Sequence, residues 1–160
     1  RRAAEDARTR EDKGKGYKGV FCGAAIEIFL GSGQTTIVTG KNSPILYAES
    51  AAILNAAKKI AEIPDDVDVI SPKVIQKMIE LKSTMGLNST SLDTKEILNA
   101  LASSSVFDKN AHRCLDALNR LKDCEMHTTH LTNEGDEKTL HQIGLILTTD
   151  AKLPFPDYRL

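Results

Sequence analysis

The chain has 160 residues, of which 41% are apolar and 4% aromatic, and it contains no Trp. This length fits a single domain with one core, built mainly from Ile, Leu, Val and Ala. The scarcity of aromatic rings argues against a base-stacking surface, and no apolar run approaches the ~18 residues that a membrane-spanning helix needs. We therefore expect neither nucleic acid nor a membrane as a partner.

Charge is spread unevenly along the chain, although the net charge is only −1. Residues 1–18 carry seven Lys or Arg against four Asp or Glu, and residues 1–15 have almost no large apolar side chain. We expect a charged linker or tail over 1–15, unless the short run Ala3–Asp6 forms a helix that docks on a neighbour. The three cysteines form no Cys-x-x-Cys pair and no signal-peptide pattern is present, which favours reduced thiols and a cytoplasmic location.

A β-hairpin is predicted at the start of a single domain that we place at residues 16–152. Apolar residues recur with period two through Gly19–Leu30, and further apolar residues lie on the other face, which is typical of a central strand. Gly31–Gln34 supplies the turn, and the β-branched run in Thr35–Gly40 predicts the returning strand.

Two helices are each expected to begin at a Ser-Pro pair. At Ser43-Pro44, the serine can cap the free amides while proline occupies the first helical position. Val67–Ile70 is predicted as a short strand, and Ser71-Pro72 then repeats the capping arrangement. A β-α-β unit with parallel strands would follow from this order.

Further elements are expected towards the end of the chain. A capping box and two apolar helical faces predict two helices, and an alternating pattern then predicts a strand, a short helix and a strand. The helices begin near Asp93 and Ala111, and the later elements cover Glu125–Leu131, Asp136–Gln142 and Leu145–Thr148. Prolines 154 and 156 predict an extended tail over 153–160. The sum is a three-layer α/β/α domain with a mixed sheet of about five strands.

This order of elements resembles the cytidine-deaminase-like fold of the zinc nucleoside deaminases. In those enzymes a metal ligand two residues before a Glu opens one helix, and Pro-Cys-x-x-Cys opens the next. Tyr47, Lys73 and Gln76 stand at the three ligand positions here, and Glu49 stands at the general acid/base position. Because a phenol, an ammonium and a carboxamide are poor zinc ligands, we expect no metal and no other cofactor.

A closer resemblance covers about nine-tenths of the chain. The matching motifs are Lys15–Glu27, Ile37–Pro44, Leu54–Ala56, Ile70–Pro72, Cys124–His127, Gly135–Glu137 and Leu147–Asp150. They resemble the C-terminal domain of the bacterial uncharacterised protein family that carries the domain of unknown function eighteen-forty-six. The resemblance implies a large additional N-terminal region in family members, a shared fold and self-association. It transfers no catalytic residue.

One segment is a candidate for binding an anion. Lys41, Asn42 and Ser43 precede a predicted helix N-terminus, where free amides and the helix dipole can hold a phosphate or carboxylate. Alternatively, Ser43 is simply the helix cap. The full set of candidate ligand-binding residues is Lys41, Asn42, Ser43, Tyr47, Glu49 and Ser71.

Histidine and cysteine residues offer weaker candidates. Cys124, His127 and His130 have metal-ligand side chains, but on a strand His127 points away from the other two, so one ion cannot join them. We interpret each histidine as partly buried and hydrogen-bonded. Cys22 and Cys114 lie in apolar patterns and are interpreted as core residues, not nucleophiles.

Two functions are compatible with these observations. The first is a non-catalytic α/β module that serves self-association, docking or small-ligand binding, as a homo-oligomer or as a component of a larger assembly. The alternative is a metal-independent hydrolase or transferase, acting on a nucleotide-like or phosphorylated substrate near the predicted helix start at Lys41–Glu49.

Overall fold

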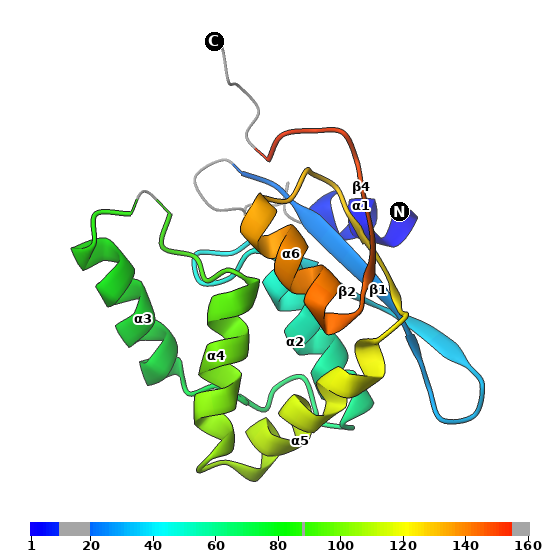
Figure 1. The fold of residues 1–160 in the computed structure, drawn as a ribbon, viewed down its shortest axis with the longest axis horizontal. Helices are drawn as coiled ribbons and strands as arrows, with labels where there is room; N and C mark the ends of the chain where they lie inside the picture. Colours follow the sequence, from blue (N-terminus) through cyan, green and yellow to red (C-terminus); the bar gives the residue numbers. More distant parts are fainter. Residues whose placement is uncertain (10–19, 88, 155–160) are drawn as a thin grey trace.

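The computed structural model describes residues 1–9, 20–87 and 89–154 as an α/β fold (Figure 1). The elements in chain order are α1 (Arg2–Thr9), β1 (Gly23–Phe29), β2 (Thr35–Lys41), α2 (Ala48–Ile60), α3 (Pro72–Thr84), α4 (Thr94–Ser105), α5 (Lys109–Ala117), the 3₁₀ turn η2 (Leu118–Leu121), β3 (Glu125–Thr128), α6 (Glu134–Ile143) and β4 (Ile146–Thr149). None of the helices in these described ranges is long and apolar enough to cross a membrane.

The sheet is mixed, as predicted, with the strand order β2-β1-β3-β4. Strand β1 is antiparallel to β2 and β3, whereas β3 and β4 are parallel and are joined through α6. Gly144 ends α6 with a φ of 96°, a conformation that suits glycine. The predicted strand, helix and strand at the end of the chain are therefore confirmed, with β3 ending at Thr128.

The sheet has four strands over the described residues, against about five predicted. The predicted strand at Val67–Ile70 is wrong, because these residues form an irregular segment between α2 and α3. The side chains of Val69 and Ile70 are buried in the core without joining the sheet. The first predicted β-α-β unit is therefore absent from the described part of the chain.

Helices cover both faces of the sheet, which confirms three layers. The inner face carries α2, which approaches so closely that a Cβ on Gly40 would overlap the backbone of Ala48 and Ala52. The outer face carries α1, and a Cβ on Gly23 would overlap the carbonyl oxygen of Ala4. Figure 1 shows α4, α5 and α6 on the same side as α2.

Residues 2–9 form α1 against the sheet, so in this range the predicted alternative of a short docked helix holds and the predicted linker does not. The reason is packing, because Ala4 and Ala7 are small enough to bury themselves against the strand at Gly23. Residues 10–15 lie outside the described residues. Of the predicted tail over 153–160, only residues 153 and 154 lie within the described residues, and they form neither helix nor strand.

The start of α2 differs from the prediction. The helix begins at Ala48, and Ser43 does not cap it, because its Oγ accepts hydrogen bonds from the amides of Ile45 and Leu46 in a preceding turn. The side chain of Asn42 serves the helix instead, since its Oδ1 accepts from the Ala48 amide at 2.9 Å. The other Ser-Pro helix, α3, starts at Pro72 as predicted, and α4 has the predicted Asp93 capping box.

Candidate functional site

Three polar side chains form a row across one end of the sheet. The amide of Asn42 bonds the carbonyl of Cys22 at 3.2 Å, and the amide of Thr129 bonds the carbonyl of Gly23 at 2.9 Å. Continuing this register places Cys22 between Asn42 on one side and His130 on the other. All three residues belong to the inner face because side chains alternate along a strand. The row therefore lies beneath the first turn of α2.

Glu49 in that first turn completes a buried charged pair. Its Oε2 lies 3.3 Å from Nε2 of His130. The exposed fractions are only 3% for Glu49 and 5% for His130, so little solvent screens the pair. The helix N-terminus also favours a carboxylate at this position.

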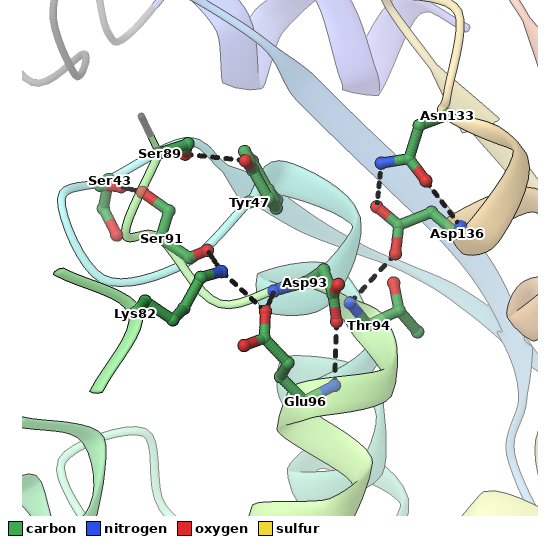
Figure 2. A network of polar contacts seen from close by, with 10 residues as sticks. All are labelled: Ser43, Tyr47, Lys82, Ser89, Ser91, Asp93, Thr94, Glu96, Asn133 and Asp136. Carbon is green, nitrogen blue, oxygen red and sulfur yellow. Dashed lines mark hydrogen bonds and ion pairs between the residues drawn. The ribbon is translucent and has the colours of Figure 1, made fainter. Parts of the chain in front are cut away.

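A second carboxyl group, Asp136 in the first turn of α6, extends the pair. Its Oδ1 accepts from the amide of Thr94 at 3.0 Å, and its other oxygen lies 3.3 Å from the Asn133 side-chain nitrogen (Figure 2). Asp136 is also a near neighbour of Glu49, and each of the two carboxyl groups shifts the pKa of the other. The N-termini of α2, α4 and α6 thus converge on two neighbouring carboxyl groups.

Burial and mutual charge set the protonation of this cluster. Burial alone would raise the pKa of Glu49, but its hydrogen bond and ion pair with His130 lower it overall. Burial raises the pKa of Asp136 to about 7, and the negative charge of Glu49 adds to the effect. At neutral pH, Glu49 is therefore an anion, whereas Asp136 exchanges its proton.

His130 is a cation in this environment. Burial alone would lower its pKa, but the neighbouring Cys22 thiol and the Glu49 carboxylate raise it to about 10. The Nδ1 atom of His130 is buried without a hydrogen-bond partner, whereas its Nε2 faces Glu49. The cluster therefore holds a charged imidazole between a carboxylate and a thiol.

The predicted ligand-binding residues do not form one site. Asn42 and Glu49 belong to the row and its cluster, but the polar atoms of Asn42 and Ser43 already bond neighbouring amides. Lys41 lies on the outer face opposite Gly23, and Ser71 is the exposed residue before α3. The hydroxyl of Tyr47 donates to Ser89 at 2.6 Å (Figure 2). Tyr47 therefore joins the start of α2 to the loop before α4.

The three deaminase ligand positions are not brought together. Lys73 and Gln76 are exposed on α3, which Figure 1 shows set apart from α2 on the far side of α4. Tyr47 is the residue before α2. Glu49 alone keeps a buried position at the helix start, and the cytidine-deaminase-like order stays a prediction.

A separate network attaches α3 to α4. Lys82 is the buried residue of α3, and its Nζ donates to the Ser91 carbonyl and to Glu96 Oε1, each at 2.7 Å (Figure 2). Glu96 also accepts from the Asp93 amide at 3.0 Å within the capping box. This network stabilises the loop before α4 and presents no group to the Cys22 row.

Sequence reasoning missed the pairing of Cys22 with His130. The two residues lie far apart in the chain and were interpreted separately, as a core cysteine and a hydrogen-bonded histidine. The one available signal was the alternation through Glu125–Leu131, which places His127 and His130 on opposite faces, as the structure confirms. Only the register of β3 against β1 brings His130 to Cys22.

The cluster provides acid, base and thiol groups, but its geometry does not fit a metal ion. Within the described ranges, no three His, Cys, Asp or Glu side chains are arranged to share an ion. Buried carboxyl groups that share a proton can exchange it near neutral pH, and an imidazole beside a thiol can activate sulfur. The site is therefore suited to proton exchange at Asp136, whereas the Cys22 thiol is only 1% exposed.

Comparison with known proteins assigns the family. The model described as domain of unknown function DUF1846, C-terminal, matches residues 1–157. The chain belongs to this family. A UPF0371 protein of Corynebacterium aurimucosum is 40% identical over 116 residues, which are 72% of this chain and 23% of that protein.

Other relatives show the same pattern of coverage. A UPF0371 protein of Clostridioides difficile is 37% identical over 74% of this chain and 24% of its own length. A UPF0371 protein of Corynebacterium diphtheriae is 37% identical over 81% of this chain and 26% of its own length. The chain thus spans about a quarter of the length of these relatives.

Proposed function

We propose that this domain is a self-associating docking module of a longer protein, not an enzyme in its own right. The observation that carries the proposal is that α1 covers only one end of the outer face of the sheet and leaves the rest exposed. There Ile37, Glu27, Glu125 and Ile146 lie side by side, one on each strand in the order of the sheet.

Apolar side chains are unusually accessible on this outer face. Ile37 is 56% exposed, and Phe29 and Ile146 are each 52% exposed. Helix α1 packs farther along the same face, over Gly23, and leaves these residues uncovered. Aliphatic and aromatic groups that share one exposed face are typical of a protein-protein contact.

The acidic pair in the middle of the row supports a charged partner. Glu27 and Glu125 are exposed and directly opposite each other on β1 and β3. Two like charges in this arrangement destabilise a sheet, unless a positive charge approaches them. Neither carboxylate has a salt bridge to another residue in the described part of the chain.

A second copy of this domain offers the matching charge. Arg1 and Arg2, at the start of α1, line the same groove of about 330 Å³ as Glu27 and Glu125. Arg1 is paired with Asp150 at 3.0 Å, and Arg2 forms no salt bridge within the described ranges. Each copy therefore carries arginine and glutamate side chains on the same outer face. A two-fold interface needs this self-complementarity, because α1 of one copy can then lie over the acidic pair of the other.

Sedimentation equilibrium tests the proposal with this chain. We expect reversible dimers at tens of micromolar, and we expect Ile37→Glu to weaken the dimer by about tenfold or more, or ~1.4 kcal/mol. Leu81→Glu is the matched control, because Leu81 is 59% exposed on α3, away from the outer face.

Two results would contradict self-association through this face. One is a strict monomer throughout that concentration range. The other is a dimer that Leu81→Glu weakens as much as Ile37→Glu does, because the contact would then lie elsewhere. Added salt should also weaken the dimer, since exposed charges are screened.

A further inference from the structure

We infer that one exposed face of α3 is a docking surface for an acidic amphipathic helix that is not part of this chain. Four apolar side chains form this surface, which we call the α3 face: Val74, Met78, Leu81 and Met85. It is distinct from the surface proposed for self-association, because that surface lies on the sheet, whereas α3 lies at one edge of the molecule (Figure 1).

The spacing of these side chains specifies a helix as the partner. Along the chain they are separated by four, three and four residues. On a helix, this spacing places them in one stripe, and it is the pattern of apolar a and d positions through which one helix packs against another. An extended strand has a side-chain repeat of two residues and does not match it.

The α3 face is accessible and contains adaptable side chains. Val74 is 37% exposed, Leu81 59% and Met85 65%, and Met78 is half-buried between them. Apolar groups that gather on one exposed surface are typical of a protein-protein contact. Two of the three methionines in the chain lie here, and their flexible, polarizable side chains suit the binding of amphipathic helices.

The attachment of α3 to its own domain uses a different stripe of the helix. Ile75 and Ile79 pack against the core, and Lys82 is buried in the polar network with α4. At the end of the helix, the amide of Leu87 donates to the carbonyl of Lys82 at 3.2 Å, which closes the last turn around Met85. A partner therefore meets a helix that is already held in place.

Lysines next to the α3 face favour an acidic partner. Lys73 is exposed and forms no salt bridge within the described ranges. Lys77 lies 2.7 Å from Glu80, but these side chains are 79% and 48% exposed, so the pair contributes little and can be exchanged for another acid. A second copy of α3 is a poor occupant, because the lysines of the two copies would face each other.

Fluorescence anisotropy with two synthetic peptides tests the inference on the wild-type chain. Both peptides contain three heptads with Ile and Leu at positions a and d. The acidic peptide has Glu at positions e and g and the basic peptide has Lys there, so that neither peptide pairs with itself. At low salt we expect the acidic peptide to bind with a Kd of ~10–100 µM, at least about tenfold more tightly than the basic one.

Two matched variants locate the contact. Leu81→Glu should weaken binding of the acidic peptide at least about tenfold, because it places a carboxylate in the middle of the α3 face. Ile37→Glu is the control and should bind the peptide as the wild type does, since Ile37 is 56% exposed but lies on the sheet. The same two variants have the opposite roles in the test of self-association, so failure of one proposal is distinguishable from failure of the other.

A charge exchange tests the role of the lysines. In the double variant Lys73→Glu and Lys77→Glu, the order of affinities should reverse, so that the basic peptide binds more tightly than the acidic one. An unchanged preference for the acidic peptide in this variant would overturn the assignment of these lysines.

Three further results would overturn the inference. The first is no binding of the acidic peptide to the wild-type chain at ~1 mM. The second is equal affinity of the wild-type chain for the two peptides, a comparison that needs no variant. The third is an equal loss of binding in Leu81→Glu and Ile37→Glu, because the peptide would then not be held by the α3 face.

Discussion

Two histidines three residues apart, on opposite faces of one sheet, have the same distance to a carboxylate but opposite protonation. His130 on the inner face lies 3.3 Å from Glu49, and His127 on the outer face lies 3.3 Å from Asp150. The pKa of His130 is raised to about 10, whereas that of His127 is lowered. Distance to a carboxylate alone therefore does not determine the charge of either imidazole.

The difference lies in what else each imidazole and its carboxylate contact, and only His130 has a thiol, that of Cys22, beside it. Asp150 is already paired with Arg1 at 3.0 Å, and burial together with the charge of the Arg1 side chain lowers the pKa of His127. Glu49 faces no other cation among the groups that shift its pKa, and its second neighbour is the acid Asp136. His130 therefore keeps its proton because the Cys22 thiol and an uncontested Glu49 both favour the charged imidazole, whereas Arg1 competes with His127 for Asp150.

The largest expected effect comes from removing the inner carboxylate. Glu49→Gln should destabilise the fold by ~3–5 kcal/mol, because it leaves a buried imidazolium without its anion. Asp150→Asn should cost only ~0–1 kcal/mol, since the Arg1 side chain in its pair is 77% exposed. Urea unfolding of both variants measures the contrast, and equal losses would show that the two pairs are energetically alike.

A smaller effect is expected from pH. The pKa of His130 rises from 6.5 in the unfolded chain to about 10 in the fold, so its contribution is fully present below pH 6.5 and is lost as pH rises towards 10. The pKa of Asp136 is raised from 3.8 to about 7, so the contribution of this group to stability is also lost as pH rises, between about pH 4 and 7. Glu49, with its lowered pKa, acts oppositely and loses its contribution as pH falls below 4.5.

The free energy of unfolding should therefore fall between pH 7 and 9, by up to ~1.4 kcal/mol per pH unit for one proton. Urea titrations at several pH values measure this slope. His130→Gln should flatten it, and His127→Gln should leave it in place. A slope that survives in His130→Gln would assign the proton to another group.

The smallest effect concerns the outer pair. Arg1→Gln should free Asp150 to act on His127 alone, and so raise the pKa of that histidine, because Arg1 also contributes to lowering it. NMR titration of the imidazole protons measures the shift. The pKa of His130 serves as the internal control and should not move.

Much of the fold followed from local patterns. The hairpin, the capping box at Asp93 and the glycine end of α6 depend on neighbouring residues, so the sequence predicted them correctly. The errors at Val67–Ile70 and Ser43 have one cause. Burial of Val69 and Ile70 in the core, and of Asn42 beneath α2, overrode the local preference.

The candidate site was less predictable than the fold. Glu49 was identified because it stands at a helix start, which is a local signal. Its partners His130 and Asp136 come from the other end of the chain, and only strand register and the placing of α6 bring them to it. Neither the strand register nor the position of α6 can be derived from the pattern of a single sequence.

The attachment of α3 has a consequence for how this domain can change over generations. One amine, that of Lys82, joins the helix to both Ser91 and Glu96, while most other side chains of α3 are exposed. Mutations at these exposed positions should therefore be tolerated by the fold, whereas Ile75, Met78 and Ile79 pack against the core. Lys82 and Glu96 add the polar contact between α3 and the start of α4, so a change at one of them should favour a compensating change at the other.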